Sequence, residues 1–358
     1  MPDVASSAFS PELTATFAAV QQHFRKVIVP LWQGPGWNAE LALPYEALSP
    51  THQPLPPQRY RAMACARQLY VFASLIDDPA FPEAIERAAA LFRSLQRHFH
   101  DAEHGGWFYS IDPQGAPLDV RKDLHYWAKV REPLVESVLN AALEVVAKQF
   151  SDGKGLYEAS LNQDWSSLNT GPLQNPLMHL AEAFLATLSV RDDAPVQAAL
   201  LALAEGMQQR FIEPVHNVML EKPRGAVDNW FEPGHQFEWY FLLESSPLMR
   251  QTSLHTSLDR AFAFAEQVGV DTNSGAVCGM LDPQGNLRDG TQRIWAQAEY
   301  LRALTLRPDG LPRLQRQLLA LQQHFLHAGG WYECLDATGQ ISREDMPSTT
   351  PYHLATCY

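Results

Sequence analysis

Apolar side chains recur at intervals of three and four residues along most of the chain, and this period predicts α-helices. The first helix is expected to begin after Ser10-Pro11-Glu12, because a serine cap and an early proline are typical of helix starts. The same period predicts further helices over 57–76, 82–99, 120–131, 133–150, 173–190, 195–211, 234–248, 254–268, 291–307, 311–325 and from 348 onward. The chain is therefore predicted to be almost entirely helical.

Short segments rich in glycine and aromatic residues follow alternate helices. Residues 105–115 (GGWFYSIDPQG) align without a gap with residues 329–339 (GGWYECLDATG). Weaker copies lie at 155–158 and 275–285, and a poor one lies at 215–223. Bulky residues bounded by Asp-x-x-Gly turns predict small β-hairpins. The repeat unit is thus helix, helix, hairpin.

Helix pairs of this kind bury both faces only when copies pack side by side. Five full units plus a lone helix at each end make six pairs if the first and last helices join. The sequence therefore predicts an all-α (α/α)6 barrel, a closed toroid with short β-hairpins between helix pairs, formed by residues 1–358 as a single domain. An open α-solenoid is the alternative.

Composition narrows the classes of partner. The chain of 358 residues is 46% hydrophobic and 19% charged, which is enough for a large core. The net charge is −13 and no Lys/Arg run is present, so neither nucleic acid nor an anionic membrane is expected as a partner. No apolar stretch approaches the ~20 residues of a membrane span.

Neither the cysteines nor the familiar short motifs indicate a cofactor. The four cysteines are far apart and form no CxxC, which argues against a zinc ribbon or a disulfide framework. Motifs of nucleotide hydrolases, dinucleotide oxidoreductases, zincins and serine hydrolases are missing. The residues Met1-Pro2-Asp3-Val4 show no targeting signal. A cytoplasmic protein without a cofactor is expected.

One polar or aromatic residue occupies the same position in each predicted inner helix, at spacings of 54 to 60 residues. These residues are Arg67, His125, His179, His235, Trp295 and His353. Residues in phase converge on the axis of a closed ring, where such a fold is expected to have its concave site. The remaining histidines fall on predicted outer helices or loops.

Partners at helical spacing strengthen two of these positions. Glu238 follows His235 by three residues, so its carboxylate can orient the ring or bind a hydroxyl. Asn175 precedes His179 by four residues, and the two side chains together supply donors and acceptors for hydroxyl groups. The set predicts a neutral polyol site equipped for proton transfer.

A cluster of histidines without a metal motif suits proton transfer at a carbon next to a carbonyl. Imidazole supplies a base whose pKa lies near working pH. The enediol oxyanion needs a fixed positive donor, a role that fits Arg67. A second histidine would move protons between sugar oxygens and open a pyranose ring. This chemistry is aldose–ketose isomerisation or 2-epimerisation.

Four segments resemble the N-acylglucosamine 2-epimerase superfamily: ARQLYVF at 66–72, NPLMHL at 175–180, PGHQFEW at 233–239 and PYH at 351–353. The resemblance implies a metal-independent (α/α)6 barrel that acts on a sugar. Members include N-acylglucosamine and cellobiose 2-epimerases, mannose isomerases, mannose 2-epimerases and sulfoquinovose isomerases.

The resemblance also implies roles for individual residues. His353 would be the general base at C2, and His235 the partner acid/base that assists ring opening. The implied substrate contacts are Arg67, Asn175, His179, Glu238 and Trp295. The segment DLHYWAK at 123–129 departs from a family pattern close to DLYDHAF, which puts His125, also taken as a substrate contact, where the family has a tyrosine. Met63 stands where the family often has a tryptophan.

Within the superfamily, the segment EPGHQFEW and the compact length favour a D-mannose isomerase that forms D-fructose through a cis-enediol(ate). The alternative is a 2-epimerase of mannose, cellobiose or N-acylglucosamine, or a sulfoquinovose isomerase, on the same residues. A monosaccharide is the expected partner of a monomer or homodimer.

Other classes of function remain open at this point. An (α/α)6 glycoside hydrolase would need two carboxylates, for which Glu238 and Glu299 are candidates, and Glu299 is also a candidate substrate contact four residues after Trp295. A zinc site would need His179, His235 and His353 together. A non-catalytic sugar-binding protein is the last alternative. No metal is expected.

Overall fold

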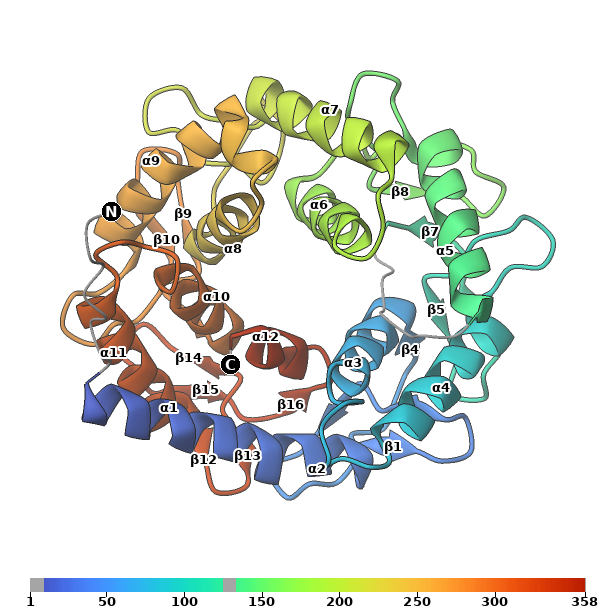
Figure 1. Ribbon diagram of the computed structural model, residues 1–358, viewed down its shortest axis with the longest axis horizontal. Coiled ribbons are helices and arrows are strands. Elements are labelled where there is room, and N and C mark those ends of the chain that lie inside the picture. Colours follow the sequence, from blue (N-terminus) through green and yellow to red (C-terminus); the bar gives the residue numbers. More distant parts are fainter. Residues whose placement is uncertain (1–9, 125–132, 358) are drawn as a thin grey trace.

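The computed structural model describes residues 10–124 and 133–357. Its helices form two concentric rings around a central axis (Figure 1). The inner ring contains α3 (Ala62–Ser74), α6 (Gln174–Leu188), α8 (Pro233–Glu244), α10 (Ile294–Leu304) and α12 (Thr350–Thr356). The outer ring contains α1 (Pro11–His23), α4 (Ala84–Ser94), α5 (Pro133–Val145), α7 (Ala194–Arg210), α9 (Ser253–Gly269) and α11 (Leu311–Ala320).

Local sequence explains where several outer helices begin. The Ser10 hydroxyl accepts a hydrogen bond from the Leu13 amide, so the predicted cap of α1 is confirmed. Asp193 caps α7 and Thr252 caps α9 in the same way. Four of the described outer helices end in a π-helical turn, at Phe24–Ile28, Leu95–Phe99, Val146–Phe150 and Leu321–Phe325. Two further short helices are α2 (Val29–Gln33), which follows the first of these turns, and Met249–Gln251, which precedes α9.

The predicted hairpins form between successive helix pairs. Their strands are β5 (Ser110–Ile111) with β6 (Pro117–Asp119), β9 (Met280–Leu281) with β10 (Leu287–Asp289), and β14 (Cys334–Leu335) with β15 (Ile341–Arg343). Asp112, Asp282 and Asp336 each accept two backbone amide hydrogen bonds within the turn. The poor copy at 215–223 makes only the isolated bridge Ile212–Met219.

Two of these hairpins, and the short strand β8 (Ser160–Leu161), also pair with the short strand that precedes the previous inner helix, whereas the β9–β10 hairpin makes only the isolated bridge Leu281–Phe231. The strand pairings join β4 (Tyr60–Arg61) to β5, β7 (Lys122–Asp123) to β8, and β11 (Gln292–Arg293) to β14. Strand β7 also corrects the prediction of a helix from residue 120, because the extended backbone of 122–123 is used for this pairing. The remainder of that predicted helix, 125–132, lies outside the described residues.

The two ends of the repeat array meet. Strand β16 (Met346–Pro347) pairs with β3 (Ala47–Leu48), α12 packs against α3, and α1 packs against α11. The small hairpins β1 (Trp37–Asn38) with β2 (Leu43–Pro44) and β12 (Leu326–His327) with β13 (Gly330–Trp331) flank this junction. The closed (α/α)6 toroid is confirmed, and the open solenoid is wrong.

Most of the buried apolar surface lies between the two rings. Phe262 on α9 is fully buried, and its ring centroid lies 5.0 Å from that of Phe237 and 4.9 Å from that of Tyr240, both on α8. None of the described helices is long and apolar enough to cross a membrane.

Replacing Phe262 with alanine is expected to lower the free energy of unfolding by about 3–5 kcal/mol, because it leaves a cavity between α8 and α9. Urea denaturation of the whole chain measures this loss. Leu287→Ala is the control, since Leu287 is 61% exposed and its truncation should change stability by less than about 0.5 kcal/mol. Equal effects of the two substitutions would contradict this view of the core.

Candidate active site

Helix α12 places His353 against a buried carboxylate. His353 is 5% exposed, and its Nδ1 lies 2.7 Å from Oε1 of Glu299 on α10. A carboxylate accepts, so Nδ1 carries the proton and Nε2 keeps its lone pair. Burial, with the nearby Arg67 charge, outweighs the Glu299 carboxylate and lowers the pKa of His353 below its usual 6.5. His353 is therefore a neutral imidazole at pH 7, with the protonation state of a general base.

His235 lies in the first turn of α8, and its pKa is shifted in the direction opposite to that of His353. Its Nδ1 lies 2.7 Å from Oε1 of Glu221, a buried residue of the loop before α8. Burial by itself would lower the pKa of His235, but the Glu221 carboxylate outweighs burial and raises it to about 9. His235 is therefore protonated at neutral pH and can act as a general acid.

The indole of Trp295 lies close to both histidines. Its ring centroid is 5.0 Å from that of His235 and 5.6 Å from that of His353. Gly234 allows this approach, because a Cβ there would lie 2.8 Å from the indole ring. A neutral and a charged imidazole thus border one aromatic surface, of the kind that stacks on the C–H groups of a sugar.

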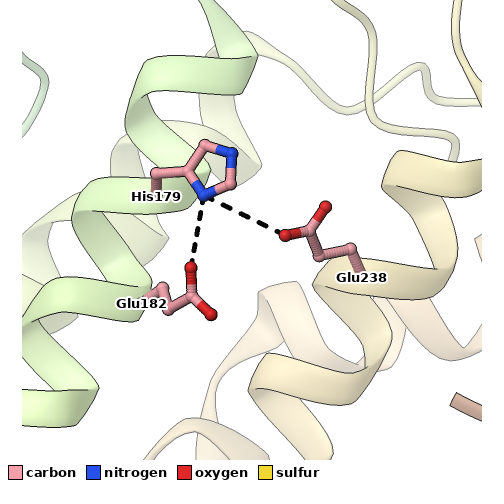
Figure 2. Close-up of side chains that lie close together, drawn as sticks. All are labelled: His179, Glu182 and Glu238. Carbon is pink, nitrogen blue, oxygen red and sulfur yellow. Dashed lines mark hydrogen bonds and ion pairs between the residues drawn. The ribbon is translucent and has the colours of Figure 1, made fainter. Parts of the chain in front are cut away.

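His179 is the centre of a second polar group (Figure 2). Its Nε2 lies 3.1 Å from Nη2 of Arg67, and its Nδ1 lies 3.2 Å from Oε2 of Glu182, one turn along α6. A guanidinium only donates, so Nε2 accepts and Nδ1 carries the proton toward Glu182. Burial disfavours the Glu182 carboxylate, but His179 and Arg302 outweigh it and lower the pKa of Glu182 to about 2.

Glu238 points from α8 toward His179 (Figure 2), and the hydrogen bond of His235 goes to Glu221 instead. Its Oε1 lies 4.0 Å from Nδ1 of His179 and has no hydrogen-bond partner among the described residues. Burial, with the neighbouring Glu299 and Glu182, raises the pKa of Glu238 well above its usual range. The carboxylate that orients His235 is therefore Glu221, and Glu238 is a neutral acid whose predicted contact with a hydroxyl stays a prediction.

Arg302 connects the His353 and His179 groups. Its Nη1 lies 3.3 Å from Glu299 Oε2, and its Nη2 lies 4.0 Å from Glu182 Oε1. The guanidinium stacks 3.9 Å from the ring of Phe241. Burial opposes its charge, but the surrounding carboxylates outweigh burial and raise the pKa of Arg302. This fixed cation contacts Glu299 and helps to lower the pKa of Glu182.

A cavity of about 240 Å³ opens beside the His179 group, a size that approaches the range of small-molecule sites, and His235, Trp295 and His353 are not among its lining residues. Its lining includes Met63, Arg67, Tyr70, His179, Glu182 and Tyr352. Met63 therefore does face the cavity, as its place in the family pattern implies. Asn175 lies in the first turn of α6 with an exposed side chain, and His125 lies outside the described residues.

The structure also bears on the zinc and hydrolase alternatives. Across 10–124 and 133–357, no cluster of potential metal ligands joins His179, His235 and His353; each histidine is grouped with carboxylates instead. Glu238 and Glu299 lie in one buried cluster with His353. Both oxygens of Glu299 contact protein groups, so it lies behind His353.

Comparison with known proteins identifies the family. The N-acylglucosamine 2-epimerase (GlcNAc 2-epimerase) family matches residues 45–357. The chain belongs to this family. The D-mannose isomerase of Pseudomonas cannabina pv. alisalensis is 28% identical over 206 residues, which cover 49% of each chain.

Solved structures of sugar isomerases and epimerases have the same fold. A D-mannose isomerase structure superposes with a TM-score of 0.82 at 20% identity, covering 95% of this chain and 96% of that one. The cellobiose 2-epimerase of Bacillus thermoamylovorans B4167 superposes with a TM-score of 0.84 at 17% identity, covering 96% and 98%. Since the family and these relatives are sugar isomerases and epimerases, the chain is an enzyme of that class.

The sequence analysis missed three charged residues that contact the predicted site residues: Glu221, Glu182 and Arg302. Glu221 lies in a loop, where helical periodicity gives no signal. Glu182 and Arg302 follow His179 and Glu299 by three residues on the same helices, so the i, i+3 spacing that identified Glu238 also marks them. That spacing was the available signal for two of the three residues.

Proposed function

We propose that this enzyme interconverts D-mannose and D-fructose by metal-independent proton transfer through a cis-enediol(ate). The observation that carries the proposal is the pair of oppositely shifted histidines at Trp295: His353 is neutral beside Glu299, and His235 is protonated beside Glu221. Acid and base of different pKa at one site are the arrangement that general acid–base catalysis requires.

In this mechanism His353 Nε2 removes the proton from C2 of open-chain mannose, and the electron pair forms the C1–C2 double bond of the enediol(ate). His235 donates a proton to the carbonyl oxygen at C1, which prevents a full negative charge from building up. Arg67 stabilises the charge that does develop. His353 then returns the proton to C1 while the now neutral His235 takes the proton from the C2 hydroxyl, which gives fructose and restores both histidines.

Other residues would hold and position the sugar. We propose that Arg67, Asn175, His179, Glu238 and Trp295 contact its hydroxyls and C–H groups. Glu238 is suited to donate, because a neutral carboxylic acid with an unpartnered buried oxygen gains a hydrogen bond when a sugar oxygen approaches. Glu299 would act through His353, whose Nδ1 proton it accepts.

A 2-epimerase is the second candidate. It is favoured by the position of His235 and His353 on the same indole, since epimerisation needs proton transfer on both faces of C2. The substrate would then be mannose, cellobiose or an N-acylglucosamine, and a sulfoquinovose isomerase would use the same residues. We further propose one catalytic domain over 1–358, in the cytoplasm, as a monomer or homodimer without metal or cofactor.

Proton NMR of the purified protein with D-mannose, D-glucose or D-fructose tests the function. Fructose is expected as the first product from mannose. Because no metal takes part, a large excess of EDTA over the protein, about 5 mM, should change the rate by less than about twofold. Glucose appearing first would identify a 2-epimerase. Loss of turnover in EDTA, or no turnover of any of the three sugars, would contradict the proposal.

A further inference from the structure

Helix α12 is too short to be stable without contacts to the rest of the protein. It has seven residues, and helices below about 12 residues are marginal in water even when their sequence is favourable. Its N-cap residue Thr349 makes no side-chain capping hydrogen bond. Because His353 lies on this helix, contacts with the rest of the barrel must fix its position.

Two buried hydrogen bonds hold the start of α12. On one side, Gln68 Nε2 on α3 donates to the Ser348 carbonyl at 2.7 Å. On the other side, the Thr350 hydroxyl in the first turn donates to Oε2 of Glu333 at 2.8 Å. Glu333 belongs to the last hairpin segment, just before β14, and is 7% exposed.

Glu333 contacts the start of α10 as well. Its carbonyl accepts from the amide of Ile294, the first residue of α10, at 3.1 Å. One residue thus touches the first turns of both helices whose side chains form the His353–Glu299 pair. The distance of 2.7 Å between those side chains depends on how the two helices lie relative to each other.

The other hairpins show that architecture alone does not require an acid here. Tyr109, Ala159 and Gly279 precede β5, β8 and β9 as Glu333 precedes β14. Tyr109 makes the same two backbone hydrogen bonds as Glu333, one to Arg121 and one to Ala62 at the start of α3. Glu221, in the poor copy at 215–223, also makes these two backbone hydrogen bonds, to Trp230 and to Gln174 at the start of α6, and its carboxylate holds His235. A carboxylate at this position is therefore found in the copies beside His235 and His353, and not in the other three.

This carboxylate is costly to bury. Burial opposes ionisation more strongly than the hydrogen bonds from Trp331 and Thr350 favour it, and it raises the pKa of Glu333 to about 7. Arg343, the nearest cation that acts on it, makes its own bidentate pair with Asp345. A carboxylate buried at such cost, and replaced by Tyr109, Ala159 and Gly279 at three equivalent positions, needs a reason other than folding of the hairpin.

We propose that Glu333 is a positioning residue for the catalytic pair: through Thr350 it holds α12 against α10, so that His353 stays on Glu299. The inference rests on the proposed role of His353 as the base. If so, the rate of the reaction depends on a hairpin residue that does not touch the sugar.

Cys357 reports on the position of α12 independently of activity. It is buried at the end of the helix, and burial raises the pKa of its thiol far above the usual value, so alkylation requires the helix to open. Cys65, buried on α3, is the internal control. Mass spectrometry after timed exposure to iodoacetamide measures both rates in one sample.

Glu333→Ala and Thr350→Val should each raise the Cys357 alkylation rate about tenfold and leave Cys65 within about twofold. Glu333→Gln and Thr350→Ser keep the acceptor or the hydroxyl, so both should stay within about threefold of the wild type. If Glu333→Ala does not fold, the Thr350 pair decides. Equal labelling of Cys357 in Thr350→Val and Thr350→Ser would overturn the proposal.

Kinetics test the link to the catalytic pair. Glu333→Ala should lower kcat about tenfold with KM within about threefold, but in a Glu299→Gln background the further loss should be under about threefold. The control Glu266→Gln removes a carboxylate that binds the outer face of α10, and should leave kcat within about twofold. Equal losses in both backgrounds would show general destabilisation and overturn the proposal.

The failure of this inference can be told from failure of the proposed function. If the wild-type enzyme turns over no sugar, the proposed function fails, yet Cys357 labelling still decides whether Glu333 holds α12. If the wild type is active but Glu333→Ala changes neither labelling nor kcat, the proposed function stands and the positioning role is wrong.

Discussion

The His353→Gln variant is expected to lose about 10³-fold in kcat, with a much smaller change in KM. Glutamine can still donate to Glu299, so the variant keeps the hydrogen bond at this position while it loses the neutral imidazole beside Trp295. General base catalysis contributes about 10²–10⁴-fold in comparable enzymes. Initial rates with mannose, followed by NMR, measure the loss.

The matched control is His324→Gln, which changes an exposed histidine on the π-helical turn of the outer ring. It should retain the wild-type rate within about twofold. A His353→Gln enzyme with more than about a tenth of the wild-type kcat would remove His353 from the role of base and would move attention to His179.

Glu221→Gln is expected to have the second largest effect, and that effect depends on pH. In the wild type, the raised pKa of His235, about 9, keeps the acid protonated below that pH, so activity should fall as pH rises through about 9. Without the Glu221 charge, only Glu232 and Glu238 still oppose burial, so the pKa of His235 should fall toward its ordinary 6.5. At a pKa of 6.5, about 3% of His235 would be protonated at pH 8, a loss of about 30-fold.

The acidic side of the profile gives a further check of sign. His353 must be neutral to act, and its pKa lies below 6.5, so wild-type activity should fall only as pH drops below that value. In Glu221→Gln the two limbs overlap, and no pH restores the wild-type maximum. Rates from pH 5 to 10 in a constant-ionic-strength buffer measure both limbs.

Glu244→Gln is the control for this profile. Glu244 is the last residue of α8, and its carboxylate lies 2.6 Å from Nε2 of His255 on the outer helix α9. The substitution therefore also removes the carboxylate of a glutamate–histidine pair that involves α8, but away from the axis. Its profile should match the wild type. An alkaline limb that stays near pH 9 in Glu221→Gln would show that His235 is not the group that titrates there.

The inner-helix residues could be predicted because the fold repeats. A nearly constant spacing of 54 to 60 residues places Arg67, His179, His235, Trp295 and His353 in phase, and phase alone brings them to one axis. The same reasoning predicted ring closure, which β16 and β3 provide. Periodicity is robust here because each repeat buries the same faces.

What the pattern did not reveal is which carboxylate serves which histidine. Glu238 has the helical spacing that suits His235, yet it points to His179, while Glu221 reaches His235 from a loop. Side chains in loops and hairpins, such as Glu221 and Glu333, follow no period, and their partners depend on the tertiary path of the chain. Charge states, and with them the acid and base roles, could be assigned only after these partners were located.

The most direct test of the central claim, proton transfer by His353 through an enediol(ate), is conversion of D-mannose in D2O. The account predicts deuterium at C1 of the fructose formed and at C2 of recovered mannose, with incorporation lost in His353→Gln. Full conversion to fructose without deuterium at either carbon would indicate a hydride shift and would contradict the account.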